Sequence, residues 1–200
     1  MKLNIYLLKA FIHLSALLPV IYWFYNGAID NLGGDPVEAL IHFSGTGALN
    51  LLLLTLAVSP LARKFKLSKL MQCRRLLGLY AAFYALIHLL SFITFELLFD
   101  FSLLVSEIVE RPYITIGMLA FAIITALAVT SPNVIKRKMG RRWQQLHNLS
   151  YVLIVLVMLH YTWSLKVLTL EPAIYIFLTA ILLFHRIYKN KRTLSFKSGR

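Results

Sequence analysis

Residues 141–166 read RRWQQLHNLSYVLIVLVMLHYTWSLK, and this stretch indicates what kind of protein the chain is. It begins with two arginines, becomes apolar after Asn148, and carries His147 and His160 near its two ends. The apolar part approaches the length of about 20 residues that an α-helix needs to cross the hydrocarbon core of a bilayer. Histidine is costly inside such a segment, so each one is a candidate functional residue.

The composition extends this interpretation to the whole chain. Of the 200 residues, 59% are hydrophobic, and the mean hydropathy is +0.72. The apolar residues occur in blocks without a polar face, which is typical of helices surrounded by lipid. We therefore expect an all-α integral membrane protein with a single transmembrane domain over residues 1–200. Its six helices are predicted at about residues 5–25, 39–59, 76–98, 113–130, 146–165 and 173–187.

The charged residues lie between these blocks and predict the orientation. The net charge is +13, and 19 of the 21 lysines and arginines fall at the N-terminus, in residues 63–75 and 136–142, or after residue 185. The alternate gaps hold Arg111, Lys166 and seven of the eight acidic residues, and the eighth, Glu96, lies near the end of the third predicted span. By the positive-inside rule, both termini are cytoplasmic, which agrees with an even number of spans. This placement favours membrane topology over nucleic-acid binding as the reason for the basic charge.

The predicted connections are too short for a soluble catalytic domain, and the longest external gap has about 15 residues. No glycine-rich dinucleotide or phosphate-binding motif is present. The single cysteine, Cys73, excludes an intrachain disulfide and a thiolate-bound iron–sulfur cluster. No repeat at a fixed period is evident, and Pro60, Pro112 and Pro132 are expected to mark helix ends. Any chemistry is therefore expected inside the helix bundle or at its rims.

His88 and His160 are the deepest histidines. The third and fifth predicted spans both start at the basic side, with His88 13 residues beyond Arg75 and His160 18 beyond Arg142. At about 1.5 Å per residue, both lie roughly 20 Å or more from the basic rim. Two imidazoles at one depth, without a deep carboxylate, fit the axial ligation of one haem. The alternative is a non-redox membrane protein, such as a small permease or an assembly factor, with structural histidines bonded to helix carbonyls.

His147 does not fit the same site. It lies 13 residues before His160, which is about 140° around a straight helix and roughly 20 Å along it. It therefore binds a second haem or acts separately at the basic rim. Arg74 and Arg75 at that rim suit haem propionates or a flavin phosphate by charge, although marking the cytoplasmic side already explains them. Trp163 is one turn from His160, where its ring can pack against a porphyrin edge.

Several segments, in the same order, resemble one known family. They are DPVEALIHFSGTGAL at residues 35–49, SPLAR at 59–63, RRLLGLYAAFYALIHL at 74–89, RPYITIG at 111–117, and the stretch 141–166. The chain resembles the MsrQ (formerly YedZ) family, the haem-binding membrane subunits of bacterial periplasmic methionine sulfoxide reductase systems. That family belongs to the ferric-reductase-like transmembrane group.

The resemblance implies a b-type haem protein that passes electrons outward across the inner membrane. The acceptor would be a periplasmic molybdopterin subunit of the MsrP type, which reduces methionine sulfoxide in envelope proteins. The donor would be quinol or a separate cytoplasmic flavin reductase, and FMN is a further cofactor without assigned residues. The chain itself would have no complete catalytic site for sulfoxide reduction.

The resemblance also implies haem ligands on the third and fifth spans, namely His88, His147 and His160. Larger ferric reductases carry two histidines on the third span. Here the position 14 residues before His88 is Arg74, so that inner ligand is missing. A second haem would need His147 together with an unusual or shared ligand.

Overall fold

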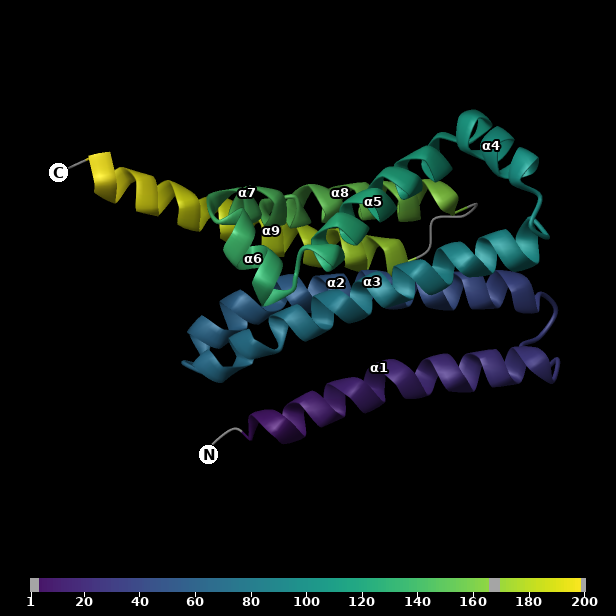
Figure 1. Cartoon of the computed structure of the whole chain (residues 1–200), viewed down its shortest axis with the longest axis horizontal. Helices are drawn as coiled ribbons and strands as arrows, with labels where there is room; N and C mark the ends of the chain where they lie inside the picture. Colours follow the sequence, from purple (N-terminus) through teal and green to yellow (C-terminus); the bar gives the residue numbers. More distant parts are fainter. Residues whose placement is uncertain (1–3, 166–169, 199–200) are drawn as a thin grey trace.

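The computed structural model describes residues 4–165 and 170–198, and each regular element in these ranges is helical (Figure 1). Lys166 lies outside the described residues. The long helices are α1 (Ile5–Ala28), α2 (Pro36–Lys64), α3 (Arg74–Ser91), α5 (Pro112–Val129), α8 (Ser150–Ser164) and α9 (Leu170–Ser198). The shorter elements are the 3₁₀ helix η1 (Ser68–Gln72), the π-helix η2 (Phe92–Glu96), α4 (Phe101–Glu110), α6 (Asn133–Met139) and α7 (Arg141–Asn148).

Five segments in the described part are long and apolar enough to cross a membrane, so the chain is a multi-pass membrane protein. They are Ile5–Ala28, Pro36–Lys64, Ser68–Glu96, Pro112–Val129 and Arg141–Ser164, and they correspond to the first five predicted spans. The sixth predicted span, residues 173–187, lies within α9 and is not among these five. The sixth span, the orientation of the termini and the single transmembrane domain therefore stay predictions.

Two local expectations differ from the structure. Pro112 begins α5 as expected, but Pro60 lies inside α2, which continues to Lys64. A membrane helix tolerates a proline where neighbouring helices cover the freed backbone group. The predicted external gap before Arg111 also contains a helix of its own, α4. Asp100 caps this helix by accepting hydrogen bonds from two backbone N–H groups of its first turn.

The core lies among α2, α3, α5 and α8. Ala81 of α3 and Ile154 of α8 are fully buried there, beside Leu49 of α2 and Ile124 of α5. Helix α1 packs against α2 and α3 on one side of the bundle, while α9 contacts α8 and α2 on the other (Figure 1). This arrangement brings the third and fifth predicted spans, which carry the deep histidines, to the centre.

Candidate functional site

His88 of α3 and His160 of α8 face each other in the bundle. Their ring centroids are 6.1 Å apart, and the two ring planes are nearly perpendicular, at 81°. The prediction that they lie at the same depth on different helices is therefore confirmed. Each residue is partly buried, so the pair occupies a largely apolar environment rather than bulk solvent.

Each imidazole is oriented by one backbone carbonyl of a neighbouring helix. The Nδ1 atom of His88 lies 3.0 Å from the carbonyl oxygen of Ile41, and that of His160 lies 2.7 Å from the carbonyl oxygen of Tyr113. A carbonyl oxygen only accepts hydrogen bonds, so both protons are on Nδ1 and both Nε2 atoms keep a lone pair. Among the described residues neither Nε2 atom forms a hydrogen bond. Histidines that bind a metal are usually held in this way.

Two glycines let the imidazoles approach these carbonyls. A Cβ atom added at Gly45 of α2 would lie 3.0 Å from Nδ1 of His88. One added at Gly117 of α5 would lie 2.7 Å from Nδ1 of His160. Any larger side chain would therefore press on the ring, which explains why glycine stands one helical turn after each acceptor carbonyl.

The two halves of the site share one spacing along the chain. In both, the histidine follows its acceptor residue by 47 positions. An offset of 72 residues relates the two sets, so that Ile41, Gly45 and His88 correspond to Tyr113, Gly117 and His160. A Ser-Pro pair recurs with the same offset, at 59–60 and 131–132. The contacts that hold the histidine in α2–α3 thus recur in α5–α8 at an offset of 72 residues, a local recurrence that sequence reasoning did not find. Few residues are identical at this offset, so the recurrence is hard to recognise in the sequence without the contacts.

The pair supplies two nitrogen donors of the kind that hold a haem iron. One metal ion bound by both Nε2 atoms needs ring centroids about 6 Å apart, because each metal–nitrogen bond is about 2.0 Å and the rings add their radii. The observed centroid separation of 6.1 Å is close to this value. The described residues contain no group of three or more His, Cys, Asp or Glu side chains that could hold a metal ion without such a macrocycle. Two neutral imidazoles in an apolar interior are instead the donors that haem uses.

His147 belongs to α7 and lies beside the C-terminal end of α5. Its Nε2 atom is 3.1 Å from the hydroxyl of Thr130, and its ring stacks on Trp143 with centroids 3.9 Å apart. Thr130 ends α5, whereas Tyr113, the partner of His160, is near its beginning, about 26 Å away along the helix. His147 is therefore not part of the facing pair, as its helical phase led us to expect.

The remaining candidates do not contact the facing pair in the described part of the chain. Arg75 donates a hydrogen bond to Asn133 over 3.1 Å, at the basic end of the bundle. Arg74 lies near His147, where the two positive charges repel when the imidazole is protonated. Trp163 is 57% exposed on α8. The proposed contact of Trp163 with a porphyrin stays a prediction.

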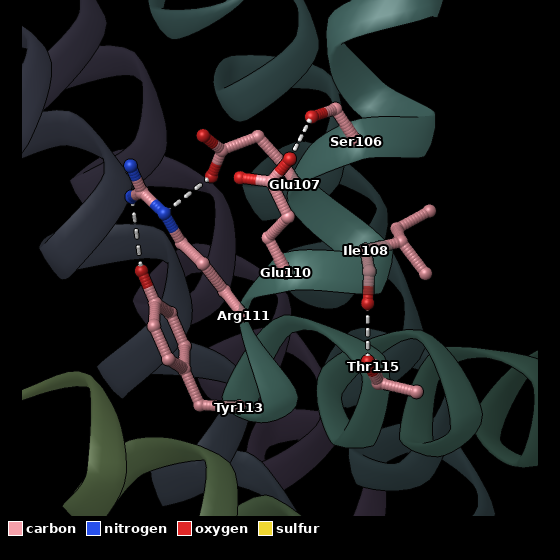
Figure 2. A network of polar contacts seen from close by, with 7 residues as sticks. All are labelled: Ser106, Glu107, Ile108, Glu110, Arg111, Tyr113 and Thr115. Carbon is pink, nitrogen blue, oxygen red and sulfur yellow. Dashed lines mark hydrogen bonds and ion pairs between the residues drawn. The ribbon is translucent and has the colours of Figure 1, made fainter.

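A polar network lies at the start of α5 and includes the side chain of Tyr113, the residue whose carbonyl orients His160 (Figure 2). The guanidinium of Arg111 donates to the hydroxyl of Tyr113 over 3.3 Å and pairs with the carboxylate of Glu107 over 2.9 Å. The hydroxyl of Thr115 donates to the carbonyl of Ile108 in α4. Helix α4 is thereby fixed to the first turn of α5. Sequence reasoning did not assign these residues to the site.

Comparison with known proteins gives consistent results. Residues 44–159 match the family described as "Ferric reductase like transmembrane component". A "Protein-methionine-sulfoxide reductase heme-binding subunit MsrQ" from Klebsiella pneumoniae is 46% identical over 186 residues, which cover 92% of each chain. Proteins of the same name from Cronobacter sakazakii and Pectobacterium carotovorum are 45% and 44% identical, each over 92% of this chain and over 92% and 93% of their own lengths.

Proposed function

We propose that this chain, which belongs to the MsrQ family of ferric-reductase-like transmembrane proteins, is the haem-binding electron-transfer subunit of a protein-methionine-sulfoxide reductase system. The observation that carries the proposal is the pair His88 and His160. Their rings are 6.1 Å apart, and each Nδ1 is held by a carbonyl, so both Nε2 atoms are left for one iron. The chain would carry electrons, while a partner subunit would reduce the sulfoxide.

In this proposal His88 and His160 would hold a b-type haem through their Nε2 atoms. A covalently attached haem needs a C-x-x-C-H motif, and Cys73 is the only cysteine in the sequence. When bound, the haem supplies a one-electron carrier in the apolar interior. The bonds from Nδ1 to Ile41 and Tyr113 fix the ring orientation and raise the basicity of Nε2.

We assign the direction of electron flow from the charge distribution. With six spans in the bacterial inner membrane, the basic end of the bundle faces the cytoplasm and the acidic end faces the periplasm. Ile41 and Tyr113 lie near the starts of α2 and α5, at the acidic end, so the facing pair is nearer the periplasm. Electrons from a cytoplasmic flavin reductase or from quinol would leave there to a periplasmic MsrP-like molybdopterin subunit.

At the basic end we propose His147 as the ligand of a second or shared haem, with Arg74 and Arg75 beside it. Ligation through Nε2 requires the contact between His147 and Thr130 to open, since Nε2 is the atom that Thr130 contacts, whereas ligation through Nδ1 leaves that contact in place. The same two arginines would also supply positive charge to bind the phosphate of FMN.

Absorption spectra of the purified protein test the proposal. The wild type should show a Soret band that sharpens with α and β bands on reduction by dithionite. His88→Ala and His160→Ala should each lose most of this absorbance, because each variant lacks one of the two imidazoles that would hold the haem. His185→Ala is the matched control and should keep it, since His185 is exposed on α9.

The same spectra separate the alternatives. A folded but colourless wild-type protein would favour a non-redox membrane protein with structural histidines. Full absorbance in either axial variant would refute the assigned pair. A partial loss in His147→Ala would support a second or shared haem, and no loss would limit His147 to its contacts with Thr130 and Trp143.

A further inference from the structure

A cleft at the basic end of the bundle lies outside the haem site. Residues of α2, α8 and α9, three helices that contact one another, line this small, partly open cleft. Its polar lining comes from Arg63 and Ser59 of α2, Tyr151 of α8, and His185 and Arg186 of α9. The cleft therefore combines two guanidinium groups from helices that are far apart in the sequence.

The two arginines have no carboxylate partner within the described residues. The ion pair found among the described residues joins Arg111 to Glu107, and it lies at the acidic end of the bundle, away from the cleft. The Nε atom of Arg186 is buried without a hydrogen-bond partner in the described part, and its guanidinium lies 5.2 Å from the ring centroid of Tyr151. A buried donor on a cation is costly to leave unsatisfied, so this site calls for an external anion.

The other walls of the cleft are apolar. Leu56 is buried at its base, and Leu182 and Leu183 of α9 form one side. The adjoining surface of α9 exposes Leu178 and Ile181, which is the pattern of a helix face that contacts lipid. A ligand for this cleft therefore has an anionic group at the rim and a long apolar part that extends toward the bilayer.

We propose that this cleft binds the phosphate of an anionic phospholipid, with Arg63 and Arg186 on the phosphate and an acyl chain along Leu182 and Leu183. A guanidinium presents parallel N–H groups that match two phosphate oxygens. Basic pockets between membrane helices bind lipid head groups by this chemistry. A free phosphate or a flavin phosphate has the same charge but no chain for the leucine wall. The inference does not depend on the haem proposal.

Native mass spectrometry of the full chain in a non-ionic detergent tests this site. Delipidated protein should bind phosphatidylglycerol at least about tenfold more tightly than phosphatidylcholine, since each charge-assisted contact is worth roughly a factor of ten. The double variant Arg63→Gln/Arg186→Gln should lose this preference. Arg186→Lys should keep part of it, because the charge remains while the two parallel donors are lost.

The control is Lys64→Gln/Lys138→Gln, which removes the same charge from the basic end without touching the cleft. It should bind phosphatidylglycerol like the wild type. An equal loss in this control would show diffuse attraction to the basic rim and would overturn the site. Full displacement of phosphatidylglycerol by millimolar inorganic phosphate would overturn the lipid and identify a soluble phosphate ligand. Size-exclusion profiles and thermal unfolding in detergent identify variants that stay folded.

Discussion

The α2–α3 pair and the α5–α8 pair hold His88 and His160 by the same contacts, yet different neighbours support them. Behind His88, the hydroxyl of Tyr84 donates to the carbonyl of Ala16 over 2.8 Å, which ties α3 to α1 inside the bundle. Behind His160, Arg111 and its partners tie α5 to α4 at the exposed acidic end. One half is thus braced by a buried contact and the other by surface contacts.

The difference shows that helix pairs with the same contacts need not be equally rigid. A buried hydrogen bond contributes more than an exposed ion pair, which solvent screens and side-chain entropy weakens. The His160 half also has the tighter fit, because the added Cβ distance at Gly117 is shorter than at Gly45. We therefore expect substitutions in the two halves to have unequal effects.

The largest effect is expected from the glycines beside the rings. Gly117→Ala places a methyl group 2.7 Å from Nδ1 of His160, and Gly45→Ala places one 3.0 Å from Nδ1 of His88. The first distance requires the ring to move and costs about 1–3 kcal/mol, whereas the second needs only a small adjustment. Haem content per protein should fall several-fold in Gly117→Ala and much less in Gly45→Ala. Gly78→Ala, where the added Cβ is 3.7 Å from Thr55, should match the wild type.

Tyr84→Phe tests the brace of the His88 half. Tyr84 is 3% exposed, and its loss leaves the carbonyl of Ala16 without this donor. The free energy of unfolding should fall by about 1 kcal/mol. Thermal unfolding in detergent measures this change, with the exposed Tyr25→Phe as the control. A Tyr84→Phe protein as stable as the wild type would mean that packing alone holds α1 against α3.

Arg111→Gln tests the brace of the His160 half and should have a smaller effect. The ion pair with Glu107 is exposed on the arginine side, so its loss should cost about 0.5 kcal/mol. Thermal unfolding should change little, and haem content should stay close to that of the wild type. A loss of haem as large as in Gly117→Ala would instead make α4 a main determinant of the position of His160.

The smallest effect concerns the cap of α4. The Ser102 hydroxyl, followed by the backbone N–H of Leu103, holds the pKa of Asp100 below its ordinary value. Because the folded-state pKa is lowered, the cap is at full strength above about pH 4, the unfolded pKa, and weakens as the pH falls through the folded-state pKa. After correction for the intrinsic pH dependence of amide exchange, the α4 amides should therefore exchange faster only in acid. Asp100→Asn should remove this pH dependence, and an unchanged profile would show that another group titrates.

Much of the fold follows from the sequence, because helices that cross a bilayer run along the membrane normal. Apolar block length predicts the helices, and the rise of about 1.5 Å per residue converts position into depth. For this reason His88 and His160 were expected at one depth, and His147 was expected elsewhere. Helix α4 was missed because its apolar residues occur in a gap that is too short for a span.

The sequence by itself determined the membrane class, five helices and the separation of His147 from the pair His88 and His160 along the bundle. Only the tertiary structure decided which groups surround those histidines: the carbonyls of Ile41 and Tyr113, the glycines beside each ring, and the Thr130 hydroxyl on His147. It also decided that Arg63 and Arg186 share one cleft. The physical reason is that hydrophobicity fixes position along the membrane normal, whereas side-chain packing between helices sets their rotation and their neighbours.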